Sequence, residues 1–112
     1  MELTLSEKNR FSVLALSGRL DALAAPAFET EARKLLDAGV HSVVVDLTDC
    51  IFVSSAGLRG ILTLAKGLRA VSGDIRFAGL QPAVLEVFTI SGFTSLFKLY
   101  PAVADATKES AA

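Results

Sequence analysis

Residues 41–69, HSVVVDLTDCIFVSSAGLRGILTLAKGLR, change their hydrophobic period midway and thereby decide the fold. The first part contains three consecutive β-branched residues, 43–45, which suit a strand buried on both faces. A short polar connection, 48–50, and an apolar run, 51–53, follow. The last part repeats apolar residues at the spacing of one helix face: Leu58, Ile61, Leu62, Ala65 and Leu68. The stretch therefore predicts a strand, a loop and a helix.

Two adjacent serines, Ser54 and Ser55, lie where the period changes. A serine directly before a helix is a good N-cap, because its hydroxyl oxygen accepts a free backbone N–H of the first turn. The pair would then lie beyond the carboxyl edge of a strand, where α/β sheets tend to have their sites. Two interpretations stay open. The serines form a plain capping pair, or one is a phosphorylation site, since a helix N-terminus tolerates a phosphate.

The rest of the chain alternates strands with helices. We expect further strands at residues 3–8, 11–16, 74–78 and 96–100. We expect helices at residues 26–38 and 55–72, a third opening at Pro82 and a weak last one after Pro101. The order ββαβαβαβα predicts a mixed sheet of about five strands with helices packed on it. The fold class is thus α/β, with one domain over residues 1–112 whose tail, 108–112, frays.

Length and composition restrict the function further. The chain has 112 residues, enough for one hydrophobic core and too few for two. It shows no apolar run of about 20 residues and no signal core, so we expect no membrane partner. The single cysteine, Cys50, allows no internal disulfide, which favours a reducing, cytoplasmic location. Eleven basic residues against twelve acidic ones argue against nucleic acid as a partner.

The sequence does not support an enzyme. The serine pair lacks the first glycine of a nucleophile elbow, and the one histidine, His41, precedes the central strand at its far end. Asp46 and Asp49 could suggest a Mg²⁺ site or a phospho-acceptor, but a capping or turn role is favoured for both. A lone cysteine with one distant histidine is no metal site, so Cys50 is interpreted as a small, semi-buried residue. We expect no catalytic residue, metal or cofactor.

The predicted helix 55–72 carries basic residues and no acidic ones. Arg59, Thr63 and Lys66 fall on one outward stripe. This stripe is either a solvated helix face or a docking surface for an acidic patch on a partner protein.

The segment 52–58, FVSSAGL, resembles the signature loop of STAS domains, the family of bacterial anti-sigma factor antagonists. Three further segments are similar to family motifs in the same order: residues 18–21, GRLD; residues 44–47, VVDL; and residues 81–84, QPAV, with 91–93, SGF. The resemblance covers nearly the whole chain and implies a STAS-like fold.

The resemblance also implies regulation by partner switching. The unmodified antagonist binds an anti-sigma factor that is also a serine kinase, and phosphorylation of one loop serine releases it. A PP2C-type phosphatase restores binding. Ser55 falls on the family's phosphorylated serine, and Ser54, which replaces an aspartate, is the alternative site. With the basic stripe included, the expected partner-binding residues are Asp21, Ser54, Ala56, Gly57, Arg59 and Lys66.

Two other functions compete with this one. The first is a non-phosphorylated STAS scaffold subunit of a lipid-transport ABC system. The second is a nucleotide hydrolase, which ranks last because the chain has no phosphate-binding loop of the G-x-x-x-x-G-K type. We expect the chain to act as a monomer.

Overall fold

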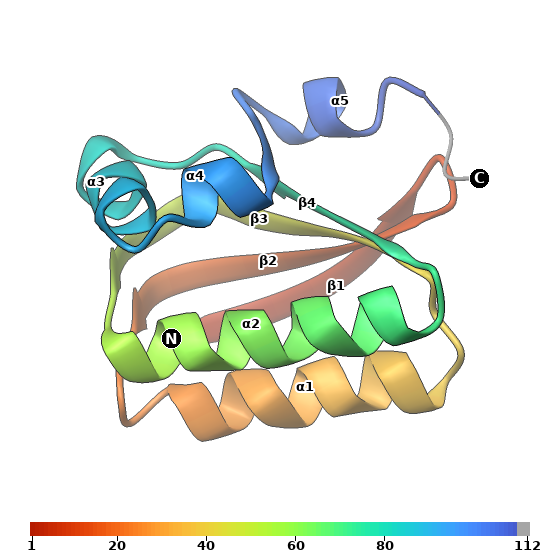
Figure 1. The fold of residues 1–112 in the computed structure, drawn as a ribbon, viewed down its shortest axis with the longest axis horizontal. Helices are drawn as coiled ribbons and strands as arrows, with labels where there is room; N and C mark the ends of the chain where they lie inside the picture. The colour runs from red at the N-terminus through yellow and green to blue at the C-terminus, as the bar shows by residue number, and fades with distance from the viewer. Residues whose placement is uncertain (110–112) are drawn as a thin grey trace.

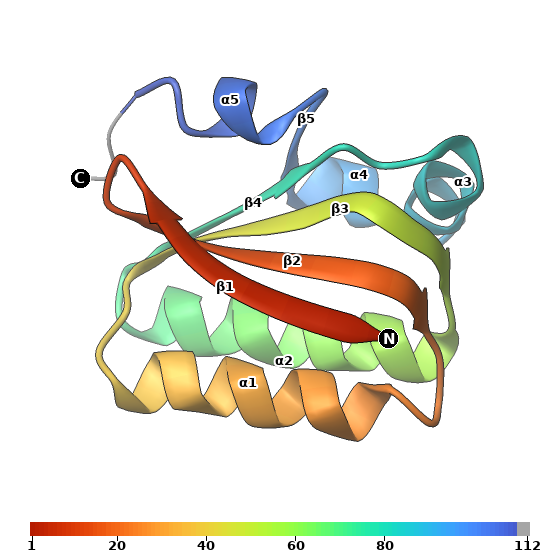
Figure 2. The ribbon, with the colours of Figure 1, turned by 180° about the vertical axis from the view of Figure 1, so that it is seen from behind.

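Five strands form one sheet whose spatial order follows the order in the chain, β1-β2-β3-β4-β5 (Figures 1 and 2). The computed structural model describes residues 1–109. β1 pairs antiparallel with β2, and the three other pairs are parallel. This confirms the mixed five-stranded sheet. The strands are β1 (Glu2–Lys8), β2 (Phe11–Leu20), β3 (Ser42–Val53), β4 (Asp74–Ala78) and β5 (Lys98–Tyr100).

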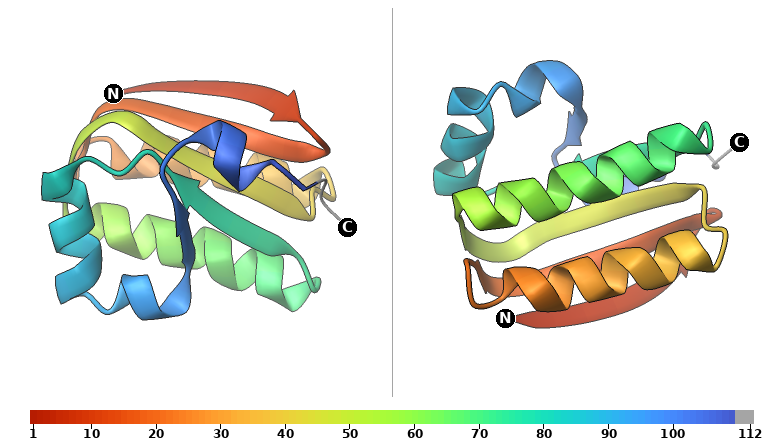
Figure 3. Two further views of the ribbon diagram at one scale, coloured as in Figure 1. Left: turned by 90° about the horizontal axis from the view of Figure 1, so that it is seen from above. Right: turned by 60° about the horizontal axis from the view of Figure 1, so that its bottom comes forward.

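The helices that connect the parallel strands lie on one face of the sheet. From β2 onward each strand is added on the same side, so right-handed crossovers bring their helices to the same face. Figure 3 shows the two long helices, α1 and α2, side by side across this face. The short α5 lies on the opposite face (Figure 1). The helices are α1 (Ala25–Asp37), α2 (Ser55–Ala70), α3 (Pro82–Ile90), α4 (Phe93–Leu96) and α5 (Val103–Ala106).

The central strand differs from the prediction. The polar residues 48–50 do not form a connection but belong to β3, which runs to Val53 and is followed directly by Ser54. β2 likewise continues past Gly18, whose φ of 96° is accommodated at a register shift. Thr48 and Asp49 are exposed, so their side chains reach water, while the backbone of Asp49 and Cys50 still pairs with β2. The polarity of residues 48 and 49 therefore does not end the strand, and burial resumes at Cys50.

The C-terminal part differs too. A helical turn, α4, stands where only a link to the last strand is expected, and β5 begins at Lys98 instead of residue 96. Four aromatic rings explain this turn, because Phe93 and Phe97 of the turn pack with Phe77 and Phe88 in the core. Of the tail expected to fray, residues 110–112 lie outside the described part, and residues 108 and 109 follow α5 without regular structure.

Helix α2 buries a wider arc than the sequence predicts. Leu58 and Leu62 are only partly buried, whereas Leu64, absent from the predicted face, is fully buried. The reason is that α2 contacts both the sheet and α1. Gly60 and Gly67 let α1 approach closely: an added Cβ would lie 3.1 Å from Phe28 and 2.5 Å from Leu36.

A second, smaller cluster lies on the opposite face, under α5. Its buried members are Phe11, Val13, Val44, Ala78 and Ala106. The guanidinium of Arg76 lies 4.7 Å from the Phe11 ring centroid and donates to the carbonyl oxygen of Ala106 at 2.8 Å, which ties α5 to β4. Within residues 1–109, no helix combines the length and the hydropathy needed to cross a membrane.

Candidate functional site at the start of helix α2

The connections that follow β2 and β3 meet at the carboxyl edge of the sheet. Leu20, the last residue of β2, pairs with Val53, the last residue of β3. Ser54 then donates its backbone N–H to the carbonyl oxygen of Leu20 at 2.9 Å. The structure thus confirms the predicted position of the serine pair, beyond the carboxyl end of the central strand and at the start of a helix.

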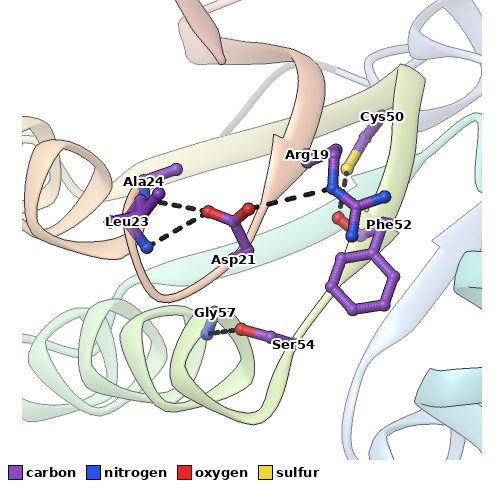
Figure 4. A network of polar contacts seen from close by, with 8 residues as sticks. All are labelled: Arg19, Asp21, Leu23, Ala24, Cys50, Phe52, Ser54 and Gly57. Atoms are coloured by element: carbon purple, nitrogen blue, oxygen red, sulfur yellow. Dashed lines mark hydrogen bonds and ion pairs between the residues drawn. The ribbon is translucent and has the colours of Figure 1, made fainter.

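The two adjacent serines differ in their surroundings. Ser54 is the N-cap of α2, and its hydroxyl oxygen accepts the backbone N–H of Gly57 at 3.2 Å (Figure 4). Ser55 is the first helical residue and is exposed. Within the described residues its hydroxyl makes no hydrogen bond. One serine therefore caps the helix, and its neighbour presents a free hydroxyl to solvent.

Gly57 allows the helix to start against the end of β2. It is buried, and a Cβ built on it would lie 2.6 Å from the carbonyl oxygen of Leu20. Only glycine fits this approach of two backbones. It therefore sets the position of the serine pair, while Ala56 before it is half-buried.

Asp21 shapes the connection between β2 and α1. One of its carboxylate oxygens accepts the backbone N–H groups of Leu23 and Ala24, both at 3.1 Å (Figure 4). The other oxygen lies 3.8 Å from Nε of Arg19. This carboxylate therefore holds a tight turn next to the start of α2.

Sequence reasoning missed Arg19 and Phe52. The Arg19 guanidinium lies 4.2 Å from the centroid of the Phe52 ring, a cation–π contact beside Asp21 (Figure 4). The two residues are 33 positions apart, and only the pairing of β2 with β3 brings them together. No local pattern in the chain could have indicated this contact.

Exposed apolar side chains surround the turn at Asp21. Leu23 is 92% exposed, Ile51 53% and Met1 39%. With Gly18, Ala24 and Ala27 they line a shallow, open hollow. The signal available in the sequence was a leucine within an otherwise small-residue connection, residues 22–25, which sequence reasoning did not use.

The basic stripe lies on the solvent side of α2. Arg59, Thr63 and Lys66 are all exposed, and neither Arg59 nor Lys66 forms an ion pair within residues 1–109. Arg69, by contrast, donates to the carbonyl oxygen of Leu96 at 3.2 Å. Arg59 lies one turn from Ser55, whereas Lys66 is about 16 Å away along the helix. The structure thus places the serine pair beside Asp21 on one side and one helical turn from Arg59 on the other, and leaves Lys66 apart.

The remaining candidates lie outside this group. His41 is exposed at the opposite end of β3, and the Asp46 carboxylate accepts the backbone N–H and the hydroxyl of Thr48 in a local turn. Burial of the thiol raises the pKa of Cys50, which is fully and not partly buried. In the described part of the chain no three His, Cys, Asp or Glu side chains cluster as a metal site would require.

The chain is similar to known proteins over most of its length. The family model described as "STAS domain" matches residues 2–106. A protein of Bordetella bronchiseptica named "Putative anti-sigma factor antagonist BtrV" is 40% identical over 97 residues, which are 87% of this chain and 84% of that protein.

Solved structures agree with the fold. An anti-sigma factor antagonist from Mycobacterium paratuberculosis superimposes with a TM-score of 0.87 at 25% identity, covering 96% of this chain and 91% of that one. The phosphorylated form of SpoIIAA, a Bacillus cell fate determinant, superimposes with a TM-score of 0.77 at 20% identity, covering 96% and 97%.

Proposed function

The chain belongs to the STAS domain family, and from this premise we propose that it is an anti-sigma factor antagonist controlled by phosphorylation of Ser55. Its unmodified form binds an anti-sigma factor that is also a serine kinase. The kinase transfers the γ-phosphoryl group of ATP to the Ser55 oxygen, which loses its proton, and ADP leaves. Binding is then lost. A PP2C-type phosphatase hydrolyses the phosphoserine to serine and inorganic phosphate.

The difference between the two serines carries the assignment of Ser55. A kinase needs a hydroxyl that it can reach, and the Ser55 hydroxyl is exposed and free of hydrogen bonds in the described structure. The Ser54 hydroxyl caps α2, so its modification would disturb the helix start. The name of the Bordetella relative, at 40% identity, supports the antagonist role.

The proposed partner surface contains Asp21, Ser54, Ala56, Arg59 and Lys66. The buried Gly57 belongs to it indirectly, because it allows α2 to start close to Leu20. A phosphate on Ser55 would add a charge of about −1.5 to −2 where the surface carried a neutral hydroxyl. If that charge meets an interface that does not compensate it, a loss of about 3 kcal/mol weakens binding roughly a hundredfold. This is enough to release a partner held at micromolar concentration.

We further propose that the chain acts by binding and performs no catalysis. His41 lies at the far end of the sheet from the serines, so it cannot act as their base. The alternative, a scaffold subunit of a lipid-transport ABC system, gains no support from the relatives above, whose names describe anti-sigma factor antagonists.

The test is to incubate the protein with its cognate kinase and ATP and to map the phosphate by mass spectrometry. We expect modification of Ser55 in the wild type and none in Ser55→Ala. Ser54→Ala serves as the matched control and should still be modified. A phosphate on Ser54 alone, or no phosphate on either serine, would contradict the assignment.

A further inference from the structure

Ser55 and Arg59 are neighbours on the surface of α2. They are separated by four positions, which places their Cβ atoms about 5–6 Å apart on one side of a helix. Both side chains are exposed. Side chains of a helix lean toward its N-terminus, so the long side chain of Arg59 can reach the turn that contains Ser55.

The guanidinium of Arg59 has no partner among the described residues. It takes part in no ion pair and no side-chain hydrogen bond there. Helix α2 contains no acidic residue. The acid beside it is Glu29 of α1, whose Cγ would lie 3.4 Å from a Cβ on Gly60, and it forms no ion pair with Arg59 either. Arg59 is therefore free to accept a new anionic partner.

We propose that Arg59 binds the phosphate of phosphoserine 55 within the same helix. This inference rests on the proposed function, because it takes Ser55 as the modified residue. A guanidinium is planar and charged, and it can donate two parallel N–H groups to two phosphate oxygens in a bidentate pair. An anionic residue four positions before a cationic one is also the favoured order for such a pair on a helix.

This contact gives phosphorylation two effects on the partner surface. The phosphate adds negative charge, and the Arg59 guanidinium pairs with the phosphate, so that it no longer contacts the partner. The basic stripe thereby loses the cation nearest to the switch. Lys66 does not share this role, because it lies about 16 Å from Ser55 along the helix, beyond the screening length of about 10 Å at moderate salt.

The experiment uses the full chain with phosphoserine introduced at position 55 by genetic encoding, so that no kinase or anti-sigma factor is needed. The ³¹P NMR signal of the phosphoserine is followed from pH 4 to pH 9. Arg59→Gln removes the guanidinium, and Lys66→Gln is the matched control with the same change of charge on the same helix. Arg59→Lys keeps the positive charge and removes the bidentate hydrogen-bond geometry of the guanidinium. Circular dichroism verifies that each variant is folded.

A nearby cation stabilises the dianion, so loss of Arg59 should move the titration midpoint to higher pH by about 0.5 units. Lys66→Gln should leave the midpoint within about 0.1 units. Arg59→Lys should fall between the wild type and Arg59→Gln. Equal shifts for the two glutamine variants, or no shift for Arg59→Gln, would overturn the contact.

The result is separate from that for the proposed function. If the cognate kinase modifies another residue, partner switching at Ser55 fails whatever the NMR titration shows. If the kinase modifies Ser55 and Arg59→Gln leaves the midpoint of the phosphoserine titration unchanged, the proposed function stands and this inference fails.

Discussion

The backbone N–H of Ser54 donates to the carbonyl oxygen of Leu20 at 2.9 Å, across the ends of two neighbouring strands. The same carbonyl group faces Gly57, where a Cβ would lie at 2.6 Å. One peptide group of β2 therefore sets the position of the first turn of α2. It also places that turn beside Asp21, which follows Leu20 in the chain. Ser55 is thus exposed on the first turn of a helix that is tied to the end of β2.

Replacement of Ser55 separates switching from folding. Ser55→Asp should keep the wild-type circular dichroism spectrum and melting temperature, because an acidic residue in the first turn is compatible with the helix dipole. It should nevertheless bind the anti-sigma partner roughly a hundredfold more weakly. Ser55→Ala should bind like the wild type and never be released by ATP. Isothermal titration calorimetry measures both affinities, and equal binding by the two variants would rule out partner switching.

Replacement of Ser54 tests its role as the N-cap. Ser54→Ala removes the acceptor for the Gly57 N–H and should lower the free energy of unfolding by about 1 kcal/mol. Ser55→Ala is the control, since its hydroxyl makes no hydrogen bond in the described structure and its loss should change stability by less than about 0.5 kcal/mol. Urea denaturation provides both values. Similar losses for the two variants would show that Ser54 has no special capping role.

Replacement of Gly57 tests the close approach to Leu20. Gly57→Ala places a methyl group against a backbone carbonyl that cannot rotate away, so stability should fall by about 1–3 kcal/mol. Gly67→Ala is the contrasting case, because its Cβ meets the flexible end of Leu36 and the helix gains up to about 1 kcal/mol of propensity. We expect it to be nearly neutral. Thermal unfolding compares the melting temperatures of both variants with that of the wild type. An unchanged melting temperature for Gly57→Ala would contradict the close approach of Gly57 to Leu20.

Reversal of the charge at Arg59 tests the basic stripe in the unmodified protein. Exposed charges act mainly on association, so Arg59→Glu should slow association with the anti-sigma partner about three- to tenfold at low salt. The difference should shrink at high salt, where the charge is screened. Lys8→Glu, at the opposite end of the sheet, is the control and should not alter the rate. Stopped-flow measurements that give wild-type rates for Arg59→Glu at low salt would exclude the stripe from the interface.

The architecture was readable from the sequence because its signals are local. The β-branched run 43–45, the 3.6-residue period after Ser55 and the glycines and prolines at element ends each report on a few neighbouring residues. The position of the serine pair followed from the same signals, since an N-cap serine needs only the helix behind it. The sequence by itself therefore determined the fold class, the mixed sheet and the position of the serine pair at the start of a helix.

The tertiary structure decided what depends on residues far apart in the chain. It distinguished the capping Ser54 from the free Ser55, because the start of α2 is set by its contact with Leu20. It joined Arg19 to Phe52 through strand register, and it widened the buried arc of α2 by packing α1 against its glycines. It extended β3 past the exposed Thr48 and Asp49, because the backbone of Asp49 and Cys50 pairs with β2. Such contacts arise between elements once they are packed, so no local pattern of residues contains them.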